Sequence, residues 1–142
     1  MSYDLMVFET SKAPTTKAEF MKWYEKLVEW GEDQDYDDAS ICSSRLQDWY
    51  REMITAFPAM NGPDAFSDEE LEDVDEDLVS RLTDYTIAAD AIYVCFSWSQ
   101  AEKAYAAMRT LAQKHSLGFF DVSGGDGWGG GDILLPDGGK MD

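Results

Sequence analysis

The sequence predicts an α+β fold in which a mainly antiparallel sheet packs against three to four helices. Hydrophobic residues make up 44% of the 142 residues, enough apolar material for one core of ordinary size. Short apolar runs rich in β-branched and aromatic residues predict strands, and segments with apolar residues three or four positions apart predict helices. In chain order these segments are a strand, helices, two strands, a helix and two more strands.

That order contains the βαββαβ succession of a split βαβ, or ferredoxin-like, core. Extra helices would enlarge its first crossover, and one strand would be added at the end. Since the chain shows no internal repeat and no second domain, residues 1–142 are expected to form a single domain.

The first strand and the first helix are predicted from residues 3–30. Residues 3–8 are a short apolar run that polar residues and Pro14 end. A helix is expected from Thr16, because Glu19 stands three residues later, at the spacing of a capping box. Its apolar face would consist of Phe20, Trp23, Tyr24, Leu27 and Trp30.

A second helix is expected to begin near Ser43 or Ser44 and to stop at Pro58. Its apolar face would consist of Leu46, Trp49, Tyr50, Met53, Ile54 and Phe57. The link before it, residues 32–38, is acidic and polar.

The segment 64–84 is an acidic insert, with ten acidic residues against one basic residue, Arg81. Ser67 and Glu70 stand at capping-box spacing, which predicts a helix over 67–82. Its apolar face would consist of Leu71, Val74, Leu78 and Leu82. Adjacent like charges oppose a helix, so an acidic loop is the alternative.

A hairpin and a long helix are predicted in the next part of the chain. Residues 85–89 and 91–97 read as strands joined tightly around Asp90. Ser99 is expected to cap the helix that follows, with Glu102 completing a capping box. The buried face of this helix would consist of Ala101, Ala104, Tyr105, Met108, Leu111 and Ala112.

The end of that helix carries residues suited to a helix C-terminus. Lys114 and His115 suit the negative end of the helix dipole, and Gly118 suits the position beyond it. Strands are then expected at residues 119–122 and 133–135.

The glycine-rich stretch 124–132 is predicted to be a hairpin loop. Asp126 and Asp132 flank its glycines, no lysine follows them and a strand comes next, all of which oppose a phosphate-binding loop. Trp128 is a candidate contact anchor, because aromatic residues dominate binding hot spots.

The charge of the chain restricts its partners. With 29 acidic and 11 basic residues the net charge is −18, which steers cationic partners towards the protein. Direct binding to nucleic acid or to an anionic membrane needs a basic surface, so neither is expected. A protein that imitates the charge of nucleic acid is an open alternative.

A cytoplasmic location is expected. The first residues carry no basic region and too short an apolar run for a signal peptide, and no apolar stretch approaches the roughly 20 residues that span a bilayer. Two cysteines, Cys42 and Cys95, make no disulfide framework. Cys95 lies in an apolar run and is expected to be a small buried hydrophobic residue.

No motif predicts an active site, a metal or a cofactor. His115 is the only histidine, and one histidine with two separated cysteines cannot form a familiar zinc set. Positions 1, 3, 5 and 12 of an EF-hand-like loop are matched by Asp73, Asp75, Asp77 and Asp84. Leu78 stands where that loop needs glycine, so no calcium site is expected. A carboxylate-based enzyme is the remaining enzymatic alternative.

Several stretches resemble a family of small, largely uncharacterised bacterial proteins. They are the opening Met1-Ser2-Tyr3-Asp4-Leu5, the turn at residues 57–63, and the block from Tyr93 through Trp98-Ser99 and Ala101-Glu102 to Gly124. This resemblance covers most of the chain and implies no catalytic motif. In general character the chain also resembles the immunity proteins of bacterial polymorphic toxin systems, which are short, acidic, cytoplasmic and single-domain.

The leading hypothesis is an immunity-type inhibitor that binds and neutralises a cognate bacterial toxin through an acidic surface. The toxin would be a nuclease or another enzyme acting on nucleic acid or nucleotides, because such enzymes carry basic substrate surfaces. An acidic regulatory or nucleic-acid-mimic binding module is the alternative. The expected primary contacts are Asp68, Glu69, Glu70, Glu72, Asp73, Asp75, Glu76 and Asp77. The secondary contacts are Asp33, Asp35, Asp37 and Asp38, with Trp128 as an anchor.

Overall fold

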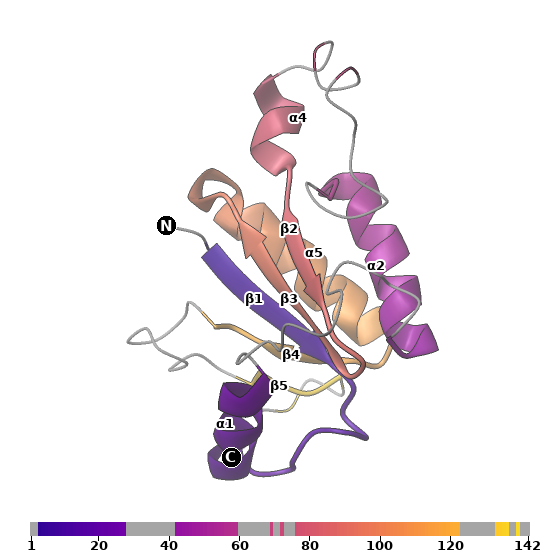
Figure 1. The fold of residues 1–142 in the computed structure, drawn as a ribbon, viewed down its shortest axis with the longest axis vertical. Helices are drawn as coiled ribbons and strands as arrows, with labels where there is room; N and C mark the ends of the chain where they lie inside the picture. Colours follow the sequence, from indigo (N-terminus) through magenta and orange to yellow (C-terminus); the bar gives the residue numbers. More distant parts are fainter. Residues whose placement is uncertain are drawn as a thin grey trace.

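A five-stranded sheet runs through the centre of the protein (Figure 1). The computed structural model describes residues 3–27, 42–59, 69, 72, 76–122, 133–136 and 139. The strands are β1 (Tyr3–Phe8), β2 (Asp84–Ile87), β3 (Ala91–Phe96), β4 (Gly118–Phe120) and β5 (Ile133–Leu134). They lie in the order β2-β3-β1-β4-β5, and every neighbouring pair is antiparallel. The predicted α+β class and the predominantly antiparallel sheet are therefore confirmed.

The order of the strands is that of a split βαβ arrangement. Both β1 and β2 are antiparallel to β3, so they are parallel to each other with β3 between them. In the same way β3 and β4 are parallel, with β1 between them. The first four strands are thus compatible with the ferredoxin-like core, and β5 is the added strand.

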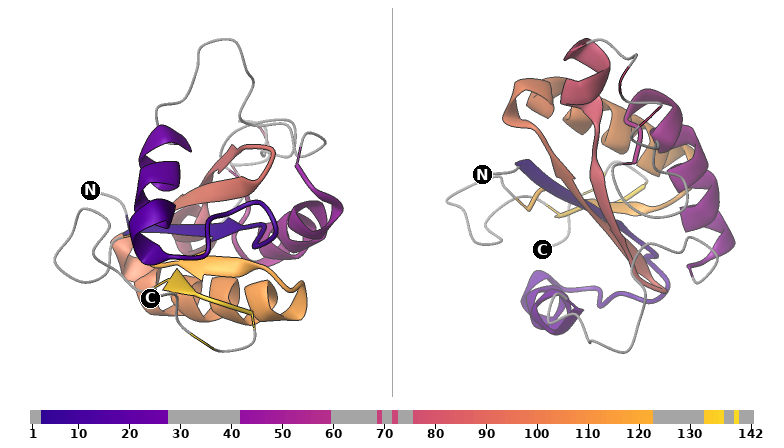
Figure 2. Two further views of the ribbon diagram at one scale, coloured as in Figure 1. Left: turned by 90° about the horizontal axis from the view of Figure 1, so that it is seen from below. Right: turned by 45° about the horizontal axis from the view of Figure 1, so that its top comes forward.

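Helices cover both faces of the sheet. The helices of the described chain are α1 (Lys17–Leu27), α2 (Ser44–Ala56), α4 (Glu76–Arg81) and α5 (Ala101–Lys114). Alternate residues of β1 enter two different cores, because successive side chains of a strand point to opposite faces. Leu5 and Val7 pack with α2 and α5, whereas Met6 and Phe8 pack with Phe20 of α1. Figure 2 shows α1 and α5 on opposite sides of the strands.

The predicted beginnings of α1 and α2 are confirmed by their caps. The Glu19 N–H donates to the Thr16 hydroxyl oxygen at 3.4 Å, just before α1. The Leu46 N–H donates to the Ser43 hydroxyl oxygen at 3.3 Å, which caps α2. Both contacts satisfy backbone donors that have no partner within the helix.

The predicted cap of α5 is wrong. Ser99 lies inside a short 3-10 turn, η2 (Trp98–Gln100), and α5 begins after it without a side-chain cap. Gln100 is buried there, and its Nε2 donates to the Ser80 hydroxyl oxygen at 3.1 Å. This contact with α4 holds the chain in the turn, so Ser99 does not stand at the helix start.

Gly118 was expected to occupy the position just beyond the end of α5, and this prediction is also wrong. The left-handed residue after α5 is Ser116, with φ of 58°. The Leu117 N–H donates to the Ala112 carbonyl at 2.8 Å and the Ser116 N–H to the Gln113 carbonyl at 3.3 Å, which is a Schellman motif. Gly118 instead begins β4, where an added Cβ would lie 2.2 Å from the Phe8 ring.

The acidic insert is described in part. The predicted helix over 67–82 is confirmed for Glu76–Arg81, and Glu69 and Glu72 are also helical. The remaining residues of 64–75, the link 32–38 and the glycine-rich stretch 124–132 lie outside the described residues. Within the described part of the chain, no helix is both long enough and apolar enough to cross a bilayer.

Candidate partner-binding surface

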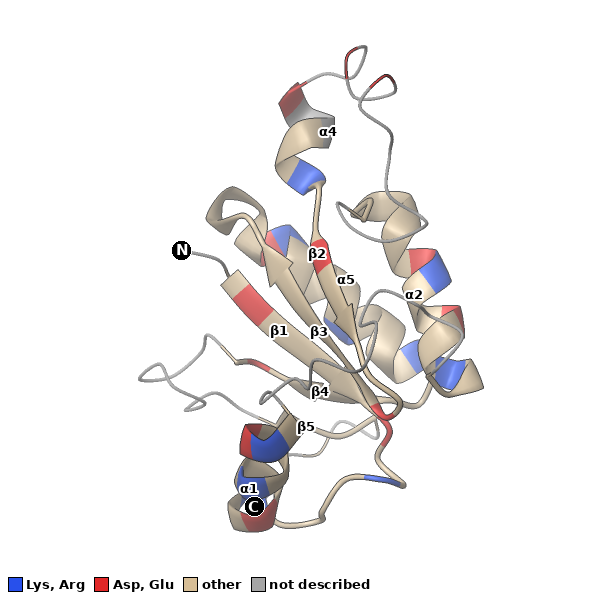
Figure 3. Ribbon diagram, in the orientation of Figure 1, with Lys and Arg blue, Asp and Glu red and all other residues tan. Residues whose placement is uncertain are grey.

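The acidic residues expected to contact a partner are exposed wherever the structure describes their side chains. Glu69, Glu72 and Glu76 are all exposed. Figure 3 shows acidic residues in and just before α4, beyond the end of the sheet. Asp77 lies within α4. The other expected contacts lie outside the described residues: Asp33, Asp35, Asp37, Asp38, Asp68, Glu70, Asp73, Asp75 and Trp128.

The chain is fixed where it enters and leaves the acidic insert. The Thr83 N–H donates to the Pro58 carbonyl at 2.9 Å, and Ala59 pairs with Thr83 in an isolated β-bridge. Nη1 of Arg81 donates to the Ala56 carbonyl at the end of α2, at 3.0 Å. Since Ser80 also accepts the Gln100 amide described above, α4 is held against both α2 and η2.

Two large hydrophobic residues are exposed on α4 and on the neighbouring turn η2. Val79 of α4 and Trp98 of η2 are each 50% exposed, and no other large hydrophobic side chain in the described ranges is classed as exposed. The two elements that carry them contact each other through the Gln100–Ser80 hydrogen bond. We refer to Glu69, Glu72, Glu76, Val79 and Trp98 as the α4–η2 surface.

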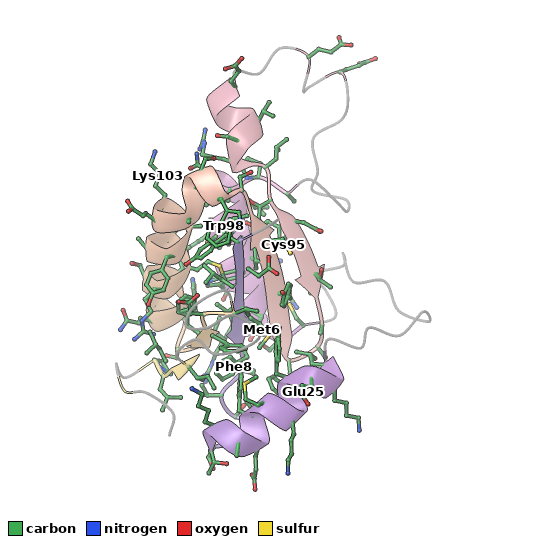
Figure 4. The ribbon with its side chains drawn as sticks, turned by 90° about the vertical axis from the view of Figure 1, so that its left-hand side faces the viewer. Met6, Phe8, Glu25, Cys95, Trp98 and Lys103 are labelled. Carbon is green, nitrogen blue, oxygen red and sulfur yellow. The ribbon has the colours of Figure 1, made fainter. Side chains whose placement is uncertain are left out.

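Trp98 also belongs to a cluster of aromatic and acidic side chains at one end of the sheet. Its ring packs against that of Tyr3 with centroids 5.1 Å apart and planes tilted by 55°. Burial, first, and then the nearby Asp121 carboxylate and Tyr105 phenol together raise the pKa of Tyr3 to about 12. Figure 4 shows Trp98 at the opposite end of the sheet from Phe8 and α1. We refer to Tyr3, Trp98, Tyr105 and Asp121 as the aromatic corner.

A second polar cluster joins α2 to α5. Glu52 accepts from the Lys114 ammonium at 2.5 Å and also contacts Nε2 of His115. These two hydrogen bonds lower the pKa of Glu52. The position of His115 at the α5 C-terminus matches the predicted helix-end role, and its partner is a carboxylate on the neighbouring helix.

A third polar cluster lies just after the C-terminal end of β1. Glu9 is 6% exposed, and it accepts a hydrogen bond from the Ser43 hydroxyl. Arg45 lies 3.8 Å from the same carboxylate. The Ser43 hydroxyl oxygen also accepts the Leu46 N–H, so this serine links the start of α2 to the end of β1.

Tyr93 and Asp4 form a polar pair on the sheet face that α1 covers in part. The Tyr93 hydroxyl donates to Oδ2 of Asp4 at 2.5 Å. Burial, first, and then the hydrogen bond to Asp4 raise the pKa of Tyr93, so the phenol stays protonated at neutral pH and serves as a donor. Cys95, opposite Asp4 in the register, is partly exposed, which corrects the expectation of a buried thiol. The alternation of β3 puts Cys95 on the face that α1 leaves partly open.

The described residues hold no group of three metal-ligating side chains. Asp84, the last position of the EF-hand-like match, is the first residue of β2 and pairs with Cys95. A residue in a strand ladder cannot close a calcium loop in the EF-hand manner. Asp73 and Asp75, two further positions of that match, lie outside the described residues.

The chain matches no protein-family model, and no curated protein or solved structure is significantly similar to it.

Trp98 is the exposed aromatic residue that sequence reasoning missed. Only Ser97 separates it from the apolar strand β3, so the sequence gives it the appearance of a core residue. The signal that identifies it is the change of structure at Ser97, where the strand ends and η2 begins.

Proposed function

We propose that the protein is an immunity-type inhibitor that binds a cognate bacterial toxin in the cytoplasm. The observation that supports this proposal is the α4–η2 surface: exposed Val79 and Trp98 lie on two elements that contact each other, and three exposed glutamates lie in and just before α4. Tryptophan is enriched among the residues that dominate binding energy, and hot spots need surrounding contacts that exclude water. A charged rim around an apolar centre is the usual anatomy of a protein interface.

The charge of the protein favours a basic partner. A net charge of −18 attracts a positively charged protein over a distance of about one Debye length, roughly 8 Å at physiological ionic strength. Nucleases and other toxins that act on nucleic acid or nucleotides carry such basic surfaces. An acidic protein that covers that surface would block the substrate and also speed its own association.

An immunity protein is expected to be encoded directly downstream of its toxin, so the test uses the product of the gene upstream of this chain as the candidate toxin. Cells that express the toxin should survive when the wild-type protein is co-expressed. Trp98→Ala should weaken toxin binding at least about 10-fold, because truncating a central aromatic anchor commonly costs more than 1 kcal/mol. Binding is measured by calorimetry, and circular dichroism checks that the variant is folded. Survival without any measurable complex would contradict direct inhibition.

The contribution of the acidic residues is separated from net charge by a matched control. One variant carries Glu69→Gln, Glu72→Gln and Glu76→Gln, and the control carries Glu19→Gln, Glu25→Gln and Asp48→Asn. All six residues are exposed, and each variant loses three negative charges. The association rate should fall several-fold more in the first variant, and this difference should shrink at high salt. Equal rates in the two variants would mean that α4 is not the contact region.

A further inference from the structure

We propose that α4 is a movable element, which leaves η2 and α2 and returns to them while the sheet and the other helices stay folded. The observations behind this proposal lie within α4 (Glu76–Arg81) and at its junction with Gln100 of η2. The movement switches the α4–η2 surface between an assembled and a separated state, because Glu76 and Val79 lie on α4 whereas Trp98 lies on η2.

The helix α4 is too short to be stable on its own. It has six residues, and isolated helices of fewer than about 12 residues are marginal in water. Its stability therefore depends on contacts with the rest of the protein. None of its described side chains belongs to either hydrophobic core: Glu76 and Val79 are exposed, and Ser80 and Arg81 are only partly buried. Apolar burial by these four side chains therefore contributes little to holding α4 in place.

Hydrogen bonds join the described side chains of α4 to the neighbouring elements. Nε2 of Gln100 donates to the Ser80 hydroxyl oxygen at 3.1 Å, and Nη1 of Arg81 donates to the Ala56 carbonyl at 3.0 Å. When α4 moves away, water can replace the lost partner in each of these bonds. Their net contribution to the docked state is therefore small.

The carboxamide of Gln100 lowers the stability of the docked state further. Gln100 is 7% exposed, and its Oε1 is buried without a hydrogen-bond partner. Oε1 lies on the same carboxamide as the Nε2 that binds Ser80, so the departure of α4 brings water to both atoms. A buried acceptor without a partner costs about as much free energy as a hydrogen bond contributes. The docked and undocked states of α4 are therefore close in free energy.

The movement ends at Thr83. This residue is fully buried, its N–H donates to the Pro58 carbonyl at 2.9 Å, and Ala59 pairs with it in the isolated β-bridge. Leu82 alone lies between Thr83 and the end of α4, which makes Leu82 the hinge. Since β2 begins directly after Thr83, its pairing with β3 does not depend on where α4 lies.

The role of this movement in recognition rests on the proposed function. A partner that contacts Val79 and Trp98 together binds only the docked state. Its apparent affinity is then reduced in proportion to the docked fraction. Binding of the partner in turn shifts the population towards the docked state.

Hydrogen exchange of the free protein tests the proposal without any partner. The N–H groups of Ser80, Arg81 and Leu82 should exchange at least about 100-fold faster than those at the centre of α5, after correction for their intrinsic rates. Ser80→Ala should accelerate exchange in α4 several-fold more and leave α5 unchanged. Thr110→Ala, which removes an exposed hydroxyl from α5, is the matched control and should leave α4 unchanged. Exchange in α4 as slow as in α5, or no response to Ser80→Ala, would overturn the proposal.

A second variant distinguishes the polar junction from simple fraying of a short helix. Ser80→Ala combined with Gln100→Met removes the hydrogen bond and the buried acceptor together, and methionine has nearly the length of glutamine. Exchange in α4 should be slower in this double variant than in Ser80→Ala alone, whereas fraying would be equal in the two. Equal exchange would therefore refute the role assigned to Gln100.

The same measurements separate this inference from the proposed function. If α4 opens in the free protein but the candidate toxin is not inhibited, the proposed function fails and the movable element stands. If α4 exchanges as slowly as α5 and the toxin is still bound, the movable element is refuted while the inhibitor function stands.

Discussion

At the scale of single residues, Gly118 shows how one missing side chain determines the packing of the sheet. An added Cβ would lie 2.2, 2.4 and 2.8 Å from three carbons of the Phe8 ring. That ring is fully buried and packs on Phe20 at a centroid distance of 4.8 Å, so it has little room to move. Only glycine fits at this position, because β4 and β1 can pair here only if no side chain lies under the Phe8 ring.

Gly118→Ala should destabilise the protein by about 1–3 kcal/mol, the usual cost of overpacking a tight core. Urea unfolding followed by circular dichroism measures the change. Phe8→Leu removes the clashing ring atoms, so the combined variant should be more stable than the sum of the two single changes predicts. Strictly additive effects would mean that the Phe8 ring is not what excludes a side chain at this position.

At the scale of elements, the pairing of α2 with α5 depends on a carboxylate that two basic side chains hold. The pKa of Glu52 lies below its ordinary value of 4.5, because Lys114 and His115 hydrogen-bond its ionised form. The ionised form is favoured by folding, so its stabilising effect is fully present above pH 4.5 and is lost as the pH falls through the lower folded value. Exposure keeps this effect small.

Glu52→Gln should lower the stability at pH 7 slightly, and the difference from the wild type should disappear once the pH has fallen below the lowered pKa of Glu52. Thermal unfolding of both proteins across this range is the measurement. Glu102→Gln is a suitable control, because Glu102 is an exposed glutamate at the other end of α5. A stability difference that persists unchanged at low pH would show that Glu52 acts by packing and not by charge.

The sequence predicts the elements well but not how they meet. The strands and the helices α1, α2 and α5 follow from apolar periodicity, and the caps at Thr16 and Ser43 follow from local spacing. The surface around Trp98 depends on a contact between Ser80 and Gln100, and periodicity carries no information about such a contact. Likewise, an apolar stripe shows that α1 packs on the sheet but not that it packs on the face opposite α5.

At the scale of the whole molecule, charge is distributed unevenly. The helix α1 carries Lys17, Lys22 and Lys26 with two glutamates, whereas the acidic residues of the insert lie at the other end of the sheet (Figure 3). A net charge of −18 still means that most charges repel each other in the folded state. Part of the stability that the two cores provide is therefore offset by this repulsion.

Moderate salt should stabilise the protein, because it screens that repulsion. We expect the melting temperature to rise by a few degrees between low ionic strength and about 0.3 M sodium chloride, where the Debye length falls well below 10 Å. Potassium chloride should act equally, since the effect is one of screening. A melting temperature that falls with added salt would show that specific ion pairs outweigh the general repulsion.

The contacts of Thr83 with Pro58 and Ala59 affect how the sequence of this protein can change during evolution. They join Pro58 and Ala59, which precede the acidic insert, to Thr83, which directly precedes β2. The entropy of closing a loop rises only slowly with its length, so residues can be gained, lost or exchanged in the insert while the sheet keeps its register. Recognition of a partner can then diverge rapidly between related chains on a scaffold that stays the same.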